Sequence, residues 1–422
     1  NFSKMFQARF FQFLIFIFIF FLFNKIVYCS TLNLDLNKAI DIAESNNLEL
    51  KFLEKDLEAK DYLRTQYSSA YLPQVDMTLI YPFVGRSSSV NFRQILYDFG
   101  KLNKRVQAGS YAIKAFEYAI VSKRDEIVNK ISENYYEILK LQNSIKKIKK
   151  DIETNRDLLS KNKAFLEAGR SSRIDVIESN IDLSESELEY IELQGKLLKH
   201  EEDLFNLLGI LKPDEVTYES ELSYTRLNLD ENQVLESRAA TDSAIKSTEM
   251  EILSQKTLIS AYKRDFLPTL VAGGAYRFEG KGVAEEDKDN DFIVGLGLTW
   301  NIFSGGKTMG QIKEAKARIK ALNAKLNFLK SQMKSTIKYG LIDLDTAYYK
   351  IDVYKKLLNS ANVNYEFVKT KFESGQSSRV DLKEAERLLQ EQSVNYENAI
   401  FSYLIKIARF EKVVGVKVNA EN

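Results

Sequence analysis

Cysteine and histidine are nearly missing from this sequence, which holds one of each. A disulfide within the chain and a metal site built from Cys and His clusters are therefore excluded, and we expect no metal ion and no cofactor. A nucleophile paired with a histidine base would have to use His200, which lies between Lys199 and the pair Glu201 and Glu202. Such a charged run is typical of a solvated helix surface, so the sequence does not predict an enzyme.

Proline is also scarce, and neither sign of charge is in clear excess. The four prolines are Pro73, Pro82, Pro213 and Pro268, so two long stretches of the chain contain none. Because proline breaks helix interiors, its absence beside 28% charged residues favours long uninterrupted helices. Lys and Arg number 60 against 59 Asp and Glu, a net charge of +1 that does not indicate a nucleic-acid partner.

A long apolar run is present near the amino end. It extends from Phe10 to Phe23 behind Lys4 and Arg9, which is typical of the apolar core of an export signal and short for a membrane-spanning helix. We therefore expect residues 1–29 to be a signal peptide. Acylation of Cys29 is the alternative, although the residue before it is a bulky tyrosine where a lipoprotein signal has a small residue.

The chain uses one turn twice. Gly-x-Ser-Ser-Arg-Ile-Asp at 169–175 recurs as Gly-x-Ser-Ser-Arg-Val-Asp at 375–381, an offset of 375 − 169 = 206. Glycine can take the left-handed conformation that ends a helix, and Ser-x-x-Asp is a capping box for the next one. The sequence therefore predicts two helical hairpins, with tips at 165–176 and 372–382.

Heptads precede both tips. The first series is Ile131, Ile138, Ile145, Ile152 and Leu159, and the second is Ile337, Leu344, Ile351, Leu358 and Tyr365, again 206 residues later. Heptads predict coiled-coil packing, but the positions three residues on are often small, as at Gly340. This pattern favours helices packed side by side into a cylinder over an isolated two-stranded rod.

A helical period predicts one helix over 35–71 and one over 234–262. The segments that follow them, 73–99 and 268–303, change to a period of two and predict four strands. The clearest alternation runs from Phe292 to Ile302, with small or polar residues between the apolar ones. Such strands fit a membrane barrel with a wet lumen, whereas a soluble sheet would need a compact core that these long helices do not offer. Four strands cannot close a barrel, and an open edge in lipid leaves backbone groups unsatisfied, so we expect several chains to share one barrel.

Taken in order, these features resemble the TolC-type outer-membrane factor family over residues 31–418. The resemblance rests on the twofold repeat, on Leu-Pro at 72–73 and 267–268, on the junctions Tyr-Asp-Phe-Gly-Lys at 97–101 and Phe-Ser-Gly-Gly-Lys at 303–307, and on the paired tips. It implies an α+β membrane protein with an internal twofold repeat, in which residues 30–212 form the first repeat and residues 213–422 the second. The expected assembly is a homotrimer that spans the outer membrane with a shared β-barrel and the periplasm with a long α-helical barrel.

The resemblance also implies a function. Members of the family are passive exit ducts of tripartite efflux pumps or type I secretion systems, and a periplasmic adaptor connects them to an inner-membrane transporter of the RND, ABC or a similar class. Cargo is chosen mainly by the transporter, so the sequence does not separate drug, metal and protein export. The alternative is an exported coiled-coil scaffold without a pore, which explains the heptads but leaves the strands and the export signal unexplained.

By position, the family's acidic entrance gate corresponds to Asp381 and Glu384, with Asp175 and Glu178 as first-repeat counterparts. Carboxylates ringed by symmetry repel one another and favour cations, and both aspartates are also expected to cap helices. Some members latch the entrance with a basic residue two positions after the tip glycine, where this chain has a serine. The expected adaptor contacts are Gly169, Arg170, Ser171, Gly375, Gln376 and Ser377.

Overall fold

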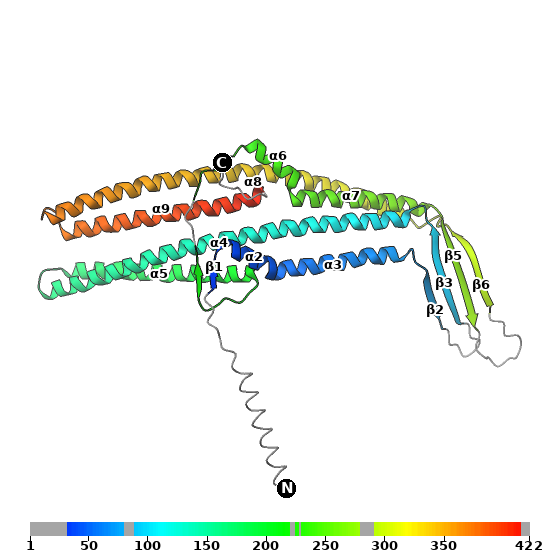
Figure 1. Ribbon diagram of the computed structural model, residues 1–422, viewed down its shortest axis with the longest axis horizontal. Helices are drawn as coiled ribbons and strands as arrows, with labels where there is room; N and C mark the ends of the chain where they lie inside the picture. Colours follow the sequence, from blue (N-terminus) through cyan, green and yellow to red (C-terminus); the bar gives the residue numbers. More distant parts are fainter. Residues whose placement is uncertain (1–31, 80–87, 220–223, 228, 279–290, 415–422) are drawn as a thin grey trace, which may run out of the picture.

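The computed structural model of the chain describes residues 32–79, 88–219, 224–227, 229–278 and 291–414. The predicted signal peptide and Cys29 lie outside these residues. Long helices form most of the molecule, a small sheet lies at one end, and the two hairpin tips lie at the other (Figure 1). None of the helices in these ranges combines the length and the apolar character needed to cross a membrane.

The two repeats have the same helix lengths. α4 (Lys101–Glu167) and α8 (Lys307–Glu373) hold 67 residues each, which corresponds to about 100 Å at 1.5 Å per residue. α5 (Arg173–Leu208) and α9 (Arg379–Val414) hold 36 each and return from the tips. Ile131, Ile138, Ile337 and Ile351 are almost completely buried, so the predicted heptads do face the helix packing.

The shorter helices correct one prediction. The sequence predicts one helix over 35–71 and one over 234–262, but both are broken, into α2 (Leu36–Asn46) and α3 (Leu48–Ser69) and into α6 (Glu231–Thr241) and α7 (Ser243–Lys263). The Asn47 side chain accepts a hydrogen bond from the Leu50 amide at 2.9 Å and donates one to the Leu207 carbonyl at 2.7 Å. Asp242 caps α7 in the same way, through the Ile245 amide at 2.8 Å. Each break is therefore a capped helix start.

The sheet is antiparallel in the order β2-β3-β5-β6, with bounds Gln74–Thr78, Ser88–Tyr97, Thr269–Phe278 and Asp291–Thr299. Its register aligns Val75 with Phe92, Phe92 with Gly274 and Gly274 with Val294 on one face. The other face carries Asp76 opposite Asn91. Because faces alternate along a strand, the sheet has one apolar and one largely polar face, as predicted. The predicted strand residues 81 and 83 lie outside the described part.

The sequence makes no prediction for the linker at 211–233, of which the structure describes residues 211–219, 224–227 and 229–233. Its strand β4 (Val216–Tyr218) pairs in parallel with β1 (Leu32–Leu34). The buried Tyr135 hydroxyl lies 2.9 Å from the Leu34 carbonyl oxygen and 2.5 Å from that of Glu219. The buried Tyr403 hydroxyl donates to the Thr225 carbonyl at 2.9 Å. Two tyrosines, on α4 and α9, thus hold the linker against the long helices.

The long helices lie side by side in a row, and the strands of the sheet do the same. Next to the sheet the helices lie in the order α3-α4-α7-α8, and toward the tips in the order α5-α4-α9-α8 (Figure 1). Within the described chain, the outer strands β2 and β6 are each paired on one side only. One edge of the protomer is therefore formed by β2, α3 and α5, and the opposite edge by β6 and α8.

Candidate functional site

Both hairpin tips are built by the same local hydrogen bonds. Gly169 and Gly375 have φ of 71° and 75°, a left-handed conformation that favours glycine. The backbone amides of the residues that follow donate hydrogen bonds to the preceding helices. The Arg170 amide donates to the Phe165 carbonyl at 2.7 Å, and the Gln376 amide to the Lys371 carbonyl at 2.8 Å. These contacts end α4 and α8 in the way expected for a helix stop with a left-handed glycine.

The two aspartates of the predicted gate cap the returning helices. Asp175 accepts the Ser172 amide at 2.7 Å, and its own amide donates to the Ser172 hydroxyl at 3.1 Å. Asp381 accepts from the Ser378 hydroxyl at 2.7 Å and from the Ser378 amide at 2.9 Å. These bonds lower the pKa of both carboxyls, Asp175 mainly through the Ser172 amide and Asp381 mainly through the Ser378 hydroxyl. Both therefore carry a full negative charge at neutral pH.

The other two gate residues differ from each other. Glu384 lies one turn after Asp381 on α9 and forms a two-point ion pair with Arg387, at 2.7 and 2.9 Å. This pairing lowers the pKa of Glu384, and the same guanidinium also contacts Glu391 at 3.1 Å. Glu178 lies exposed on α5. Sequence reasoning missed Arg387, although its spacing of three and four residues from the two glutamates is a recognisable helix signal.

The predicted adaptor contacts lie at the ends of the two hairpins. Gly169, Arg170, Gly375 and Gln376 are exposed. The hydroxyls of Ser171 and Ser377 are instead used inside the turns, where each donates to the capping aspartate, at 2.8 and 3.0 Å. The position two residues after the second tip glycine is thus occupied by a serine that orders its own turn.

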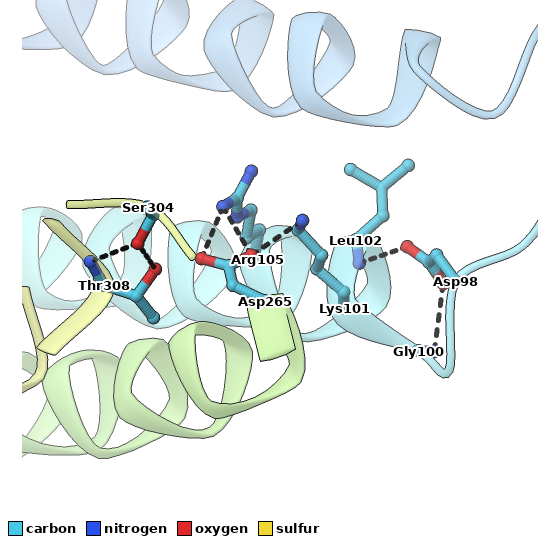
Figure 2. Close-up of polar contacts among 8 residues, drawn as sticks. All are labelled: Asp98, Gly100, Lys101, Leu102, Arg105, Asp265, Ser304 and Thr308. Carbon is cyan, nitrogen blue, oxygen red and sulfur yellow. Dashed lines mark hydrogen bonds and ion pairs between the residues drawn. The ribbon is translucent and has the colours of Figure 1, made fainter. Parts of the chain in front are cut away.

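At the opposite end, the junction between sheet and helices is a second polar cluster (Figure 2). The Asp98 carboxylate is 7% exposed and accepts the amides of Gly100 at 2.9 Å and Leu102 at 2.7 Å, which caps α4. In the second repeat the Ser304 hydroxyl caps α8 more loosely, accepting the Thr308 amide at 3.4 Å. The aspartate therefore satisfies two orphan helix donors where the serine satisfies one.

Asp265 joins the two repeats at this junction. It lies in the short 3-10 helix η1 (Arg264–Phe266) and pairs with Lys101 at 2.7 Å and Arg105 at 3.3 Å, both on α4 (Figure 2). Nearby, the Trp300 indole donates to the Phe266 carbonyl at 2.9 Å. Sequence reasoning missed this cluster, because its partners are far apart along the chain and no local spacing indicates it.

Comparisons with known proteins agree with this geometry. The outer membrane efflux protein family matches residues 39–210 and 234–416. The chain is 23% identical to outer membrane protein TolC of Vibrio cholerae serotype O1 over 163 residues, an alignment that spans 37% of each protein. The TolC-type channels of this family are trimers that work with adaptor proteins and inner-membrane transporters, and they are not enzymes.

The fold extends over nearly the whole chain. The Campylobacter jejuni CmeC outer membrane channel has a TM-score of 0.77 and 18% identity, covering 92% of this chain and 87% of that one. The open state of the Neisseria gonorrhoeae MtrE outer membrane channel has a TM-score of 0.74 and 15% identity, covering 92% of this chain and 90% of that one. The chain belongs to the outer membrane efflux protein family, as an outer-membrane protein of TolC type whose helical part lies in the periplasm.

Proposed function

We propose that three copies of this chain close head to tail into a passive exit duct for a tripartite efflux pump or a type I secretion system. The observation that carries the proposal is the pair of open edges. One edge is formed by β2, α3 and α5 and the other by β6 and α8, and both continue through the sheet and the helices. Edges that differ from each other join head to tail, and such an interface gives a ring when its rotation closes.

Apolar stripes support this closure at the tip end. Six aliphatic residues of α5 recur at three-, four- and seven-residue steps and are 50% to 65% exposed in the single protomer: Ile174, Ile177, Ile181, Leu188, Ile191 and Leu198. The opposite edge helix, α8, carries a matching stripe that is 53% to 68% exposed: Tyr339, Ile342, Tyr349, Val353, Val363 and Phe367. Apolar surface of this extent marks a contact with another chain, and the spacing is that of a coiled-coil seam.

The sheet supports closure in the membrane. Its edge strand β6 would pair with β2 of the next protomer, so that three chains of four strands give a ring of twelve. The exposed face of β6 presents Phe292, Val294, Leu296 and Leu298, which suits lipid. Trp300 follows this row at the end nearest the helices and is also exposed, as aromatic side chains are at the edge of the hydrocarbon layer.

The charges at the tips support a gated entrance. Three-fold symmetry would bring three copies of Asp381 together. Their mutual repulsion would favour the passage of cations between them, or an entrance in which the three carboxylates are further apart. Asp175 and Glu178 would add to this negative field from the first-repeat hairpin. Glu384 contributes less, because Arg387 compensates its charge within the same helix. The exposed tip residues Gly169, Arg170, Gly375 and Gln376 are the proposed contacts for the adaptor, which links the duct to the inner-membrane transporter.

The test is reconstitution of the full chain in planar lipid bilayers, together with an unheated gel for the oligomer. We expect a trimer that conducts ions and prefers cations. Asp381→Ala is expected to lower the cation preference, and Arg387→Gln to raise it because it frees Glu384. A monomer that is extracted without detergent and carries no current would overturn the duct and favour the scaffold without a pore.

A further inference from the structure

A groove of about 1110 Å³ runs along the helices near the sheet. Its lining comes from α3, α4, α7 and α8, which lie in this order side by side. Because one hollow touches all four helices, including α3 and α8 at the two ends of the row, we infer that it lies on the concave side of the row. In a closed ring the concave side faces the lumen, so this inference rests on the proposed function.

The floor of the groove is formed by α4, whose lining residues apart from Arg105 are alanine, glycine, isoleucine and phenylalanine. Tyr67 of α3 lies against Gly109 of α4, where an added Cβ would be 3.7 Å from the tyrosine ring. The buried hydroxyls of Ser247 and Ser254 on α7 donate to α4 carbonyls at 2.7 and 2.8 Å, so they are already satisfied. The groove therefore presents mainly hydrocarbon and aromatic surface at its base.

The rim of the groove is basic. Five cationic side chains line it, and among its described lining residues Glu251 is the only acid: the five are Lys60, Arg64, Arg105, Lys307 and Arg318. Glu251 itself lies 3.7 Å from Lys325. Within the described part of the chain, Lys307 has no acidic partner within ion-pair distance, and Arg105 remains 38% exposed beside Asp265.

Three of the rim cations have partners that a ligand could replace. Lys60 and Arg64 pair with Asp56 and Asp61 on their own helix, and Arg318 pairs with Glu314 in the same way. These ion pairs lie on the helix surface, where such contacts contribute little to stability. The rim can therefore exchange them for an anion that also covers the apolar floor.

We propose that this groove is a lumenal binding site for amphipathic anions, molecules with an apolar body and a sulfonate, carboxylate or phosphate head. The head would contact the cations of α3 and α8, and the body would cover Tyr67 and the neighbouring small residues of α4. A hydrophobic floor and a few charged groups are the usual composition of a small-molecule site. An anion inside the duct would thus be attracted by the basic groove and repelled by the acidic tips.

The experiment measures binding by calorimetry to the full-length protein in nanodiscs, with empty nanodiscs as the blank. The probe is 1-octanesulfonate, compared with octyltrimethylammonium, which has the same chain and the opposite charge, and with inorganic sulfate, which has no chain. We expect saturable binding of octanesulfonate alone. Arg64→Gln and Lys307→Gln should each weaken it about tenfold, as expected for the loss of one charged contact. Tyr67→Ser should also weaken it.

Lys55→Gln is the matched control, since Lys55 is an exposed cation of α3 outside the groove. It should leave octanesulfonate binding unchanged, and each variant is first checked for its oligomer on an unheated gel. Equal binding of the ammonium probe, or unchanged octanesulfonate binding in both charge variants, would overturn the proposal. Because calorimetry requires no current, binding by a protein that does not conduct would refute the duct and leave the groove as an anion site without a lumenal role.

Discussion

The stripe on α5 leads to a quantitative prediction for the seam between protomers. Ile191 is 64% exposed in the single protomer. Full burial of an isoleucine stabilises by about 1.5–3 kcal/mol, so burial of this exposed part contributes about 1–2 kcal/mol at each seam. Ile191→Asp loses this contribution and also places a carboxylate in an apolar contact, at a cost of at least about 2 kcal/mol more. We therefore expect a loss of about 3–4 kcal/mol per seam.

A ring of three contains this seam three times, so the loss for the whole trimer is about 9–12 kcal/mol. Each 1.4 kcal/mol is a factor of about ten in an equilibrium constant, so trimer association should weaken by at least about six orders of magnitude. Mass photometry in detergent, over a dilution series, should therefore find Ile191→Asp as a monomer where the parent protein remains a trimer.

Lys196→Asp is the control, because it introduces the same carboxylate at an exposed position of α5 outside the stripe. This variant should remain a trimer. If Ile191→Asp is as stable a trimer as Lys196→Asp, α5 does not lie in the seam, and the proposed head-to-tail ring is wrong.

Three further predictions concern single side chains. Gly340→Ala should destabilise the protein by about 1–3 kcal/mol in chemical denaturation, because its new Cβ would lie 2.5 Å from the buried Phe410 ring. Gly310→Ala on the same helix is the control: its new Cβ would meet open space, so it should stabilise the protein by up to about 1 kcal/mol. Asp98→Ala should cost about 1–3 kcal/mol in the same assay, because it leaves two helix amides without their buried acceptor. Hydrogen bonds within its own turn lower the pKa of Asp381, and repulsion between copies in a ring acts in the opposite direction. The cation preference that Asp381 supplies should therefore be present at neutral pH and be lost on acidification, and a cation preference that does not change with pH in bilayer recordings would contradict this assignment.

The tips show how much of a candidate site a sequence can specify. The Ser-x-x-Asp pattern predicts that Asp175 and Asp381 cap helices, and the structure places each within hydrogen-bond distance of a serine three residues earlier. Donor and acceptor lie within one turn, so their meeting depends on local backbone geometry alone. Their gating role is still a prediction, because it depends on copies of the chain that meet at the symmetry axis.

The helix breaks show where such local reasoning fails. Apolar residues recur on both sides of Asn47 with a helical period, and a single helix follows from that period. The break is stabilised by a hydrogen bond from Asn47 to the Leu207 carbonyl, a partner 160 residues away in the sequence. No pattern around position 47 contains that information, although asparagine is a favoured helix cap.

By itself, the sequence determined the twofold repeat, the equal helix lengths, the two-faced strands and the capped tips, because each follows from periodicity or from contacts within one helical turn. Only the tertiary structure decided the course of the linker held by Tyr135 and Tyr403, the bridge from Asp265 to α4, and the grouping of cations around an apolar groove. These features join residues that are distant in sequence. Their partners are chosen by how the helices pack, and packing depends on the whole chain at once.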